Sequence, residues 1–405
     1  MAYEIRPILD EEFERFSRQI ATTFLNDFRA EFMEDRKTVF ERERSLGVFD
    51  GDQVVGTTGI FTFDMAIPGG LLPTAGVTMV TVRSTHRRQG IVTSIMRRQL
   101  EDVREKGEPM AGLWASESII YGRFGYGLAA QTVDLTIERD HAQLATTTPA
   151  PGKLRIVSGD AAREQWPAIW EAEHRQSPGT MSRTQAWWSN RIFRDPEPWR
   201  GGFTANVYVN YEVDGELRGY VRYRLKGDEI DGLPNGTLRV AELVALTDDA
   251  YSELWQYVFG VDLIATIEAP HRRADEPLYW MLADPRRLKR RPSDALWLRI
   301  VDVPACLSAR RYSVEGTIVF RVEDDFLGAG GTFALTGGPD GATCTQSNAS
   351  PDISLNIRDL GAAYLGGVSF TTLARAGRIS GDRAALRRAD VMFSWDPAPW
   401  CPEVF

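Results

Sequence analysis

The segment VTVRSTHRRQGIVTSIMRRQL, residues 80–100, carries the clearest chemical potential, because an apolar run passes there through a basic turn into a helical pattern. The turn contains His86, Arg87, Arg88 and Gly90. Backbone N–H groups at the start of a helix lack intrahelical acceptors, and with the positive end of the helix dipole they form an anion site. Basic residues at that end are unfavourable by up to about 1 kcal/mol. The pattern predicts a pyrophosphate site, and the alternative is an ordinary surface helix with a basic first turn.

Two familiar phosphate-binding motifs do not fit this turn. It lacks the GxxxxGK(S/T) of a P-loop, and it has one glycine where GxGxxG requires three. The single Gly90 still allows an anion to approach the backbone closely, since it has no side chain in the way.

The elements that must position the turn form a first α/β unit of about 140 residues. Alternating apolar runs and helical patterns follow one another in the order β-α-β-β-β-α-β-α-β. This order predicts a mixed sheet with helices on both faces. The predicted elements are a strand at 3–9, a helix at 10–25, a hairpin at 44–70, a strand at 71–82, a helix from 90, a strand at 108–116, a short helix at 118–127 and a strand pair at 128–140.

A second α/β unit follows a segment rich in Thr, Ala and Pro, residues 141–152, which is typical of a linker. It contains a helix at 163–177, a hairpin at 203–227 and a strand–helix–strand at 238–270. The last of these resembles the centre of the first unit. Its turn reads LTDDAYSEL, with no basic residue and no glycine, so the second unit is predicted to be a degenerate copy.

A third region begins near residue 297 and is predicted to be a small α+β domain. A hairpin at 316–338 is followed by a strand and helix over 342–367 and by another helix at 369–379. The fold class is therefore a multidomain α/β (α+β) protein. The predicted domains are residues 1–150, 151–296 and 297–405.

Composition limits the classes of partner. The chain has 405 residues and a formal net charge of −9, which argues against nucleic-acid binding by bulk electrostatics and suits a polycationic small molecule or simply solubility. Cys306, Cys344 and Cys401 form no CxxC or Cys/His cluster, so no metal site or disulfide framework is expected. The first residues do not resemble a signal peptide, and no apolar run reaches the length of a membrane span. A cytoplasmic protein is expected.

Two stretches together carry a family resemblance. VTVRSTHRRQGIV resembles the coenzyme A turn of GNAT N-acetyltransferases, which carry Q/R-x-x-G-x-G/A after a strand. Arg87 and Gly90 fit this motif, whereas Val92 departs from its small final residue. With ASESIIYGRFGYG at 115–127, the whole chain resembles the enhanced intracellular survival (Eis) family. That family combines tandem GNAT folds with a C-terminal α+β domain similar to sterol carrier protein.

The resemblance implies acetyl-CoA as co-substrate, no metal, and a set of site residues. Tyr121 corresponds to the acid that protonates the departing thiolate, and the carboxylate of Phe405 to the catalytic base. Asp27 and Glu403 are candidates to line an acidic substrate pocket, with an N-cap or solvated role as the alternative. The ending WCPEVF places its acidic residue two positions before the terminal Phe, not next to it, which leaves the pocket lining open. The implied coenzyme-binding residues are Val80, Thr81, Val82, Arg88, Gln89, Gly90, Ile91, Val92, Thr93, Ser116 and Glu117.

The chemistry is consistent with these roles. A phenol with a pKa of about 10 matches a thiol of about 8.5 as a proton donor. A carboxylate with a pKa of about 3.5 is a poor base for an ammonium group, so Phe405 is expected to hold the cation first. It can accept a proton second, through water, if burial raises its pKa. For Tyr121 and Tyr126 the alternative is a packing role.

The predicted function is transfer of acetyl groups to primary amines of polycationic small molecules such as aminoglycosides, at several positions of one substrate, with antibiotic resistance as the consequence. The family assembles as homohexamers, so self-association is expected. Two alternatives stay open. One is a protein-lysine N-acetyltransferase with the same site and a different pocket width. The other is a lipid-binding protein whose tail domain carries an apolar ligand and whose acetyltransferase site is vestigial.

Overall fold

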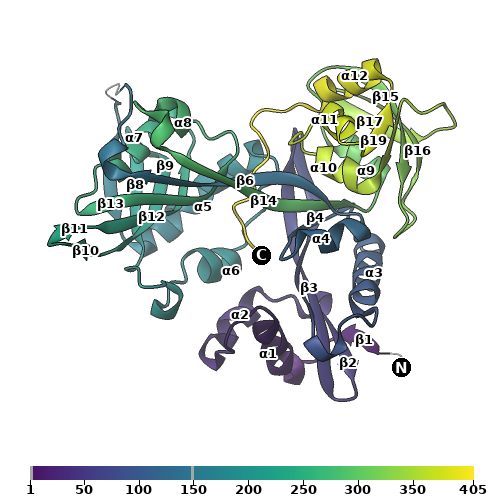
Figure 1. Cartoon of the computed structure of the whole chain (residues 1–405), viewed down its shortest axis with the longest axis horizontal. Helices are drawn as coiled ribbons and strands as arrows, with labels where there is room; N and C mark the ends of the chain where they lie inside the picture. Colours follow the sequence, from purple (N-terminus) through teal and green to yellow (C-terminus); the bar gives the residue numbers. More distant parts are fainter. Residues whose placement is uncertain (1–2, 147–149) are drawn as a thin grey trace. The chain divides into compact units, whose positions relative to one another are not determined.

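The computed structural model describes residues 3–146 and 150–405 and divides them into two compact units (Figure 1). The first unit comprises Met1–Ala130, Pro178–Ser182 and Asp294–Phe405, and the second comprises Gln131–Ser177 and Arg183–Ser293. Each unit is therefore assembled from separate stretches of the chain. The predicted boundaries 1–150, 151–296 and 297–405 stay a prediction, and residues 147–149 of the predicted linker lie outside the described residues.

The first unit is built on a mixed sheet in the order β1-β2-β3-β4-β5-β14. All neighbours in this order are antiparallel except β4 and β5, which are parallel. The strands are β1 (Glu4–Pro7), β2 (Leu46–Asp50), β3 (Gln53–Ile67), β4 (Gly70–Val82), β5 (Met110–Trp114) and β14 (Lys289–Ile300). The helices are α1 (Phe13–Thr23), α2 (Met33–Val39), α3 (Ile91–Glu105) and α4 (Ser118–Tyr121).

Apolar periodicity explains why α1 and α3 pack on this sheet. In α3 one face is apolar and buried, because its residues are each at most 3% exposed: Ile91, Ile95, Met96, Leu100 and Val103. They pack with strand residues of β3, β4 and β5. The helix is thereby held with its N-terminus at the end of β4.

The same unit contains a small α+β domain that begins after β14. Its five-stranded sheet has the order β17-β16-β15-β18-β19, with β15 and β18 parallel. Buried Arg310 holds two helix ends, because its guanidinium donates to the carbonyl oxygens of Tyr364 and Phe393. The elements are α9 (Val303–Ala309), β15 (Gly316–Glu323), β16 (Gly331–Gly338), β17 (Gly341–Gln346), β18 (Ile353–Asn356), α10 (Ile357–Ala363), α11 (Phe370–Arg375), β19 (Ile379–Gly381) and α12 (Arg383–Phe393).

The second unit repeats the pattern of the first, in the order β6-β13-β12-β9-β8-β7. Here β12 and β13 are the parallel pair, and the other neighbours are antiparallel. The strands are β6 (Gly127–Glu138), β7 (Lys153–Val157), β8 (Val207–Val213), β9 (Glu216–Lys226), β12 (Gly236–Ala245) and β13 (Ile264–Arg273), with a separate hairpin of β10 (Glu229–Ile230) and β11 (Leu233–Pro234). The helices are α5 (Gly159–Gln176), α6 (Gln185–Trp187), α7 (Asp248–Phe259) and α8 (Leu278–Met281).

The structure differs from the sequence prediction in a few elements. Residues 128–140, predicted as a strand pair, form the single long strand β6, which pairs with β13. The stretch 342–367 contains two strands before its helix, and α2, β19 and α12 were not predicted. Short elements such as α2 and β19 give little periodicity, which is why they escape such a prediction. Helix α12 is different, because its buried Leu386, Ala389 and Phe393 form an apolar face that the sequence prediction missed.

Within residues 3–146 and 150–405, the structure has no helix that is both long enough and apolar enough to cross a membrane.

Candidate active site

The turn before α3 has the geometry of an open anion site. Gly90 is the N-cap residue, with φ +80°, and no side chain accepts a hydrogen bond from the first-turn N–H groups. The first turn of α3 contains no acidic residue. A Cβ built on Gly90 would have nothing within 4 Å, so the space above the backbone is open. The N–H groups that open α3 are thus available to an anion.

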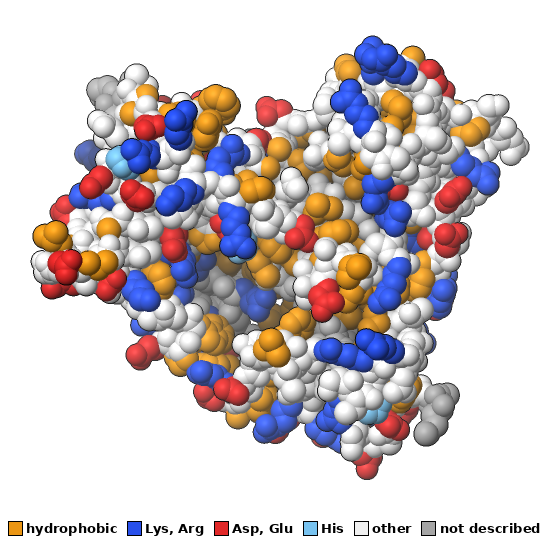
Figure 2. All heavy atoms as spheres, viewed as in Figure 1, with side chains coloured by type: hydrophobic (Ala, Val, Ile, Leu, Met, Phe, Trp, Pro, Cys, Tyr) orange, Lys and Arg blue, Asp and Glu red, His pale blue; other side chains and the backbone are white. Residues whose placement is uncertain are grey.

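Basic side chains surround this helix end. Arg87 and Arg88 are exposed, and neither forms an ion pair with another residue in the described part of the chain. His86 is tied to Asp50, with Nε2 3.2 Å from Oδ2, and Gln89 Oε1 accepts a hydrogen bond from the Tyr3 hydroxyl at 2.5 Å. Figure 2 shows Lys and Arg side chains over the region that Figure 1 labels α3. The local charge is therefore positive although the whole chain is acidic.

The other predicted turn residues differ in what they can offer. Thr93 is exposed and Val92 is half-buried, whereas Ile91 is 3% exposed and belongs to the core. Ile91 can therefore contribute only its backbone N–H. The departure of Val92 from a small residue is accommodated because its side chain packs against the partly buried edge of the α3 core.

A gap between β4 and β5 opens next to this turn. The two strands pair only from Thr74 with Met110 to Gly76 with Gly112, although β4 continues to Val82. Beyond the pairing, β4 carries a one-residue bulge: Met79 has φ +55°, and the register opposite β3 shifts there. A bulge bends and twists its strand, which separates β4 from β5.

Val80, Thr81 and Val82, which the family resemblance implies as coenzyme-binding residues, lie in this separated part of β4. Val80 is half-buried, whereas the side chains of Thr81 and Val82 are buried. The Thr81 hydroxyl lies 2.6 Å from that of Thr57 on β3, so it serves the sheet. Backbone groups of these residues, on the side where β5 has left, are what the strand offers to an extended ligand.

Tyr121 lies at the end of α4, directly after β5. Its side chain is 5% exposed and its hydroxyl is hydrogen-bonded to the Ser116 side chain. Burial raises the pKa of Tyr121 above its ordinary value of 10; the hydrogen bond to Ser116 opposes this shift and the Glu117 charge adds to it. Tyr121 is therefore a protonated phenol at neutral pH and can act as a proton donor. Ser116 and Glu117 themselves are exposed.

Tyr126 differs from Tyr121 in its surroundings. It is fully buried, its ring centroid lies 6.0 Å from that of Tyr121, and its hydroxyl has no hydrogen-bond partner among the described residues. Burial raises the pKa of Tyr126 as well. Gly125 between them has φ +85°, and a Cβ there would lie 2.8 Å from the Arg299 guanidinium carbon. Glycine is needed because Arg299, paired at 2.7 Å with buried Asp324, packs directly on this turn.

Phe405 is seated where β4 and β5 part. Its ring centroid lies 5.2 Å from that of Phe63, and a Cβ built on Gly76 would be 3.3 Å from the Phe405 ring. Gly76 is the last β4 residue that pairs with β5. The segment that carries the proposed carboxylate thus reaches the same gap as β4 and the residues after β5.

The two acidic candidates lie in different environments. Glu403 is 4% exposed within the C-terminal segment, so it is not a solvated side chain. Asp27 is exposed in the loop after α1 and is not the N-cap of the neighbouring helical turns.

Phe63 and Gly76 were not predicted as site residues. An isolated glycine within a strand is a sign of close approach by another group, so Gly76 carried a usable signal. Phe63 carried none, because an alternating apolar residue in a strand is ordinary core. In the described parts of the chain, no cluster of three or more His, Cys, Asp and Glu side chains is arranged to hold a metal ion.

The corresponding turn of the second unit is closed. The turn between β12 and α7 consists of residues 246–247 alone. The Thr247 side chain accepts a hydrogen bond from the Ala250 N–H, and Asp248 and Asp249 occupy the first turn of α7. An N-terminus that is capped and carries two carboxylates repels an anion.

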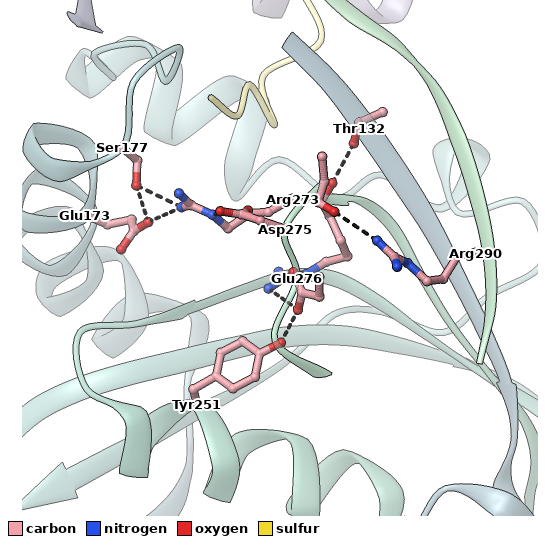
Figure 3. Close-up of polar contacts among 10 residues, drawn as sticks. Thr132, Glu173, Ser177, Tyr251, Arg273, Asp275, Glu276 and Arg290 are labelled. Atoms are coloured by element: carbon pink, nitrogen blue, oxygen red, sulfur yellow. Dashed lines mark hydrogen bonds and ion pairs between the residues drawn. The ribbon is translucent and has the colours of Figure 1, made fainter. Parts of the chain in front are cut away.

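The gap between β12 and β13 is also occupied. These strands pair only as far as Arg239 with Glu268. Beyond that, Arg272 on β13 donates to the Leu243 carbonyl oxygen of β12 at 2.9 Å and pairs with Glu276 at 3.1 Å, both buried. Tyr251 of α7 donates to the same Glu276 carboxylate (Figure 3). Side chains of the unit itself therefore fill the place where the first unit has its gap.

A second cluster in Figure 3 braces the same strand end. Arg273 Nη1 donates to Glu173 Oε1 and to Ser177 Oγ, each at 2.9 Å, and Arg290 donates to the Ala274 carbonyl oxygen at 2.9 Å. These contacts link α5, β13 and β14 residues within the second unit.

Comparison with protein-family models gives three matches. A model described as an acetyltransferase (GNAT) domain matches residues 4–129, a second one matches residues 179–300, and a sterol carrier protein domain matches residues 303–402. The fold and the site thus define a tandem GNAT N-acetyltransferase with a sterol-carrier-protein-like C-terminal domain, as predicted. GNAT acetyltransferases use acetyl-CoA as the acetyl donor.

Similar proteins narrow this class. The chain is 42% identical over 386 residues to an uncharacterized N-acetyltransferase of Streptomyces avermitilis, covering 93% of each. It is 35% identical over 360 residues to the N-acetyltransferase Eis of Mycobacterium bovis, covering 86% of this chain and 85% of that protein. The crystal structure of Eis1 from Mycobacterium abscessus superposes with a TM-score of 0.86 at 31% identity, covering all of both chains. The chain belongs to the Eis family of N-acetyltransferases.

Proposed function

We propose that this enzyme transfers acetyl groups from acetyl-CoA to primary amines of polycationic small molecules such as aminoglycosides, at several positions of one substrate. The observation that carries the proposal is the position of Phe405 against Gly76, where β4 and β5 part. The Phe405 ring lies where the separated part of β4 begins, and we propose that the carboxylate of the same residue points into the gap between β4 and β5. An amine held at this point lies beside the path of an extended acyl donor.

The coenzyme is proposed to bind along β4 and the turn before α3. The N–H groups from Gly90 to Thr93 and the side chains of Arg88 and Gln89 would hold the pyrophosphate. Backbone groups of Val80, Thr81 and Val82 would hold the pantetheine arm, since β5 does not pair with them. Ser116 and Glu117 would lie near the thioester end, because Ser116 is hydrogen-bonded to Tyr121.

The reaction then divides between two residues. The amine nitrogen attacks the thioester carbonyl carbon, a C–N bond forms, and the C–S bond breaks. Tyr121 gives its proton to the departing thiolate, which its raised pKa permits because the phenol stays protonated at neutral pH. The Phe405 carboxylate holds the ammonium group and takes its proton through water. Positioning of the two reactants supplies much of the rate.

The acceptor class is supported by charge. The net charge of −9 attracts a polycation, and the buried carboxylate of Glu403 lies two residues from Phe405. Asp27 is proposed as a further acidic contact. A substrate with several amines can bind in more than one orientation, so repeated acetylation is expected.

The test is release of thiol from acetyl-CoA by protein that ends at Phe405, with aminoglycosides, spermidine and lysine peptides as acceptors. Release with polyamines, and more than one added acetyl group by mass spectrometry, is expected. Release with lysine peptides alone would favour the protein-lysine alternative. Absence of acetyl-CoA binding by calorimetry would contradict the proposal and favour the lipid-binding alternative.

Self-association as a homohexamer is proposed with this function. Large apolar side chains of the second unit are exposed: Trp280 by 80%, Leu263 by 71% and Leu233 by 69%. Apolar side chains that form one contiguous exposed patch are typical of surfaces that become covered, whereas single ones are common on monomers. Light scattering coupled to size exclusion is expected to give six times the chain mass, and a monomeric mass would contradict this.

A further inference from the structure

The C-terminal segment that follows α12 carries the Phe405 carboxylate and has no regular secondary structure of its own. Residues 394–405 contain no helix or strand, and they end at Phe405 on β4. Productive geometry at a reacting group requires positions fixed to about 0.5 Å. Other residues of the first unit must therefore hold the C-terminal segment in place. Trp400 and Cys401 are at most 3% exposed, so they show which part of the segment is packed against the rest of the unit.

A short segment between α5 and α6 supplies that support. Residues 178–182 run along β3 as an added antiparallel piece of strand, with a bridge between Met65 and Met181. Gly179 N–H donates to the Ala66 carbonyl oxygen at 2.8 Å, and Ala66 N–H donates to that of Thr180 at 2.9 Å. This edge of β3 is open to them because β2 pairs with β3 only as far as Thr58.

The C-terminal segment docks on this added strand. Trp400 N–H donates to the Pro178 carbonyl oxygen at 2.8 Å. Gly179 has φ +94°, and a Cβ there would lie 2.8 Å from the Trp400 oxygen and 3.3 Å from its nitrogen. Both neighbours are backbone atoms, so they cannot swing away as a side chain tip would. Only glycine fits between the two segments.

Strand β3 holds residues 178–182 and also contacts the end of the C-terminal segment. Asp64 and Ala66 of β3 bind residues 178–182 through their backbone, with Ser182 N–H donating to the Asp64 oxygen at 2.9 Å. Phe63, next to Asp64, packs on the Phe405 ring. Trp400 is thus held to β3 through residues 178–182, and Phe405 packs on β3 directly, so both contacts bear on the position of the carboxylate.

We propose that residues 178–182 form a clamp that sets the position of the Phe405 carboxylate, with Gly179 as its positioning residue. The effect of the clamp on catalysis rests on the proposed function. Its effect on the position of the C-terminal segment rests only on the contacts described above. Gly179 touches no reacting atom. It acts by letting the backbone at Trp400 approach residues 178–182 closely.

The first experiment measures the clamp without any activity. Carboxypeptidase releases Phe405 from molecules whose C-terminus has left its seat, so the rate reports the open population. Gly179→Ala is expected to raise the release rate at least tenfold over wild type, measured by mass spectrometry. The matched control is Gly377→Ala, at φ +71° with nothing within 4 Å of its Cβ, which bears the same backbone strain without a contact.

A second variant covers the case in which Gly179→Ala does not fold. Pro178→Gly keeps the carbonyl acceptor of Trp400 but loosens the backbone, and a smaller increase in release is expected. Release from Gly179→Ala, or from Pro178→Gly in its place, at the rate of Gly377→Ala would overturn the clamp.

The second experiment asks whether the clamp acts through the carboxylate. Gly179→Ala is expected to lower kcat/KM for the amine by about 10–100-fold, since a displacement of 1 Å has costs of this size, with KM for acetyl-CoA unchanged. In a chain extended by one glycine after Phe405, the same substitution is expected to change kcat/KM less than twofold. Equal losses in both chains would overturn the link to the carboxylate. A wild type without acetyl transfer would instead refute the proposed function, and the carboxypeptidase rates would still decide the clamp.

Discussion

The centre of the first unit, β4–turn–α3, and that of the second, β12–turn–α7, share one frame. In each, the middle strand is antiparallel to one neighbour and parallel to the other, and it carries a one-residue bulge. The two centres differ in the turn that joins this strand to its helix. Residues 83–90 connect β4 to α3 and leave its N-terminus open, whereas residues 246–247 connect β12 to α7 and cap it. The frame of this fold therefore does not depend on the chemistry of its turn.

The two units also differ in what occupies the gap between their parallel strands. Where β4 and β5 separate, the first unit has backbone groups without strand partners. Where β12 and β13 separate, Arg272 crosses to the Leu243 carbonyl oxygen. A backbone group that has lost its partner must bond to something. In the proposed function, the first unit leaves this to the coenzyme, whereas the second unit supplies the side chain of Arg272.

The largest expected effect tests whether the first unit alone is catalytic. Tyr121→Phe is expected to lower kcat by about 10²–10⁴ with acetyl-CoA affinity unchanged, because the proton donor is lost. Tyr126→Phe is the matched control and should keep its turnover, since the Tyr126 hydroxyl has no partner among the described residues. Because burial raises the pKa of Tyr121, the phenol should stay protonated below pH 10, and its deprotonation should not lower kcat in that range. Steady-state kinetics against pH decide this, and full turnover of Tyr121→Phe would point to a second site.

A stability measurement tests the side chain that fills the second unit. Arg272→Ala leaves the buried Glu276 carboxylate without its cation, which costs about 3–5 kcal/mol in the free energy of unfolding. Urea unfolding followed by tryptophan fluorescence measures this loss. The double variant Arg272→Met with Glu276→Gln removes both charges and should regain part of it. A loss under about 1 kcal/mol would mean that this ion pair does not hold the strands.

The turn itself can be made to resemble that of the second unit. Gly90→Asp places a carboxylate at the open N-terminus of α3, in imitation of the acidic start of α7. KM for acetyl-CoA is expected to rise about 10–100-fold, because like charges repel at the pyrophosphate site. Gly377→Asp adds the same charge at another left-handed glycine and should leave KM unchanged. An unchanged KM in Gly90→Asp would remove the turn from coenzyme binding.

The smallest effect concerns the cap of α7. Thr247→Ala removes the acceptor for the Ala250 N–H and is expected to cost about 1 kcal/mol in the free energy of unfolding. Thr247→Ser keeps the hydroxyl and should be close to wild type. KM for acetyl-CoA should be the same in both. A change in that KM would show that the second turn still contributes to the coenzyme.

Local pattern was enough to predict the elements around the site. The buried stripe of α3 and the basic turn follow from spacing and residue type, and the missing glycine of LTDDAYSEL marked the degenerate turn. Which strand closes each sheet was not predictable, because β14 pairs with β5 and β6 pairs with β13 across long separations in sequence. The seat of Phe405 on Phe63 and Gly76 escaped for the same reason: nothing local says which distant residue covers a glycine. The roles of the individual site residues stay predictions.

Because the gap of the second unit is filled by its own side chains, the two units should differ in how a bound ligand changes their thermal stability. A ligand that binds only the folded state raises its unfolding free energy by RT ln(1 + [L]/Kd), about 2.7 kcal/mol at one hundred times Kd. With the coenzyme bound as proposed, only the first unit gains this increment. The second unit carries Arg272 and Glu276 in that place at all times, so its stability is independent of metabolite supply. In a cell rich in acetyl-CoA, the bound coenzyme would therefore raise the unfolding free energy of the first unit and leave that of the second unit unchanged.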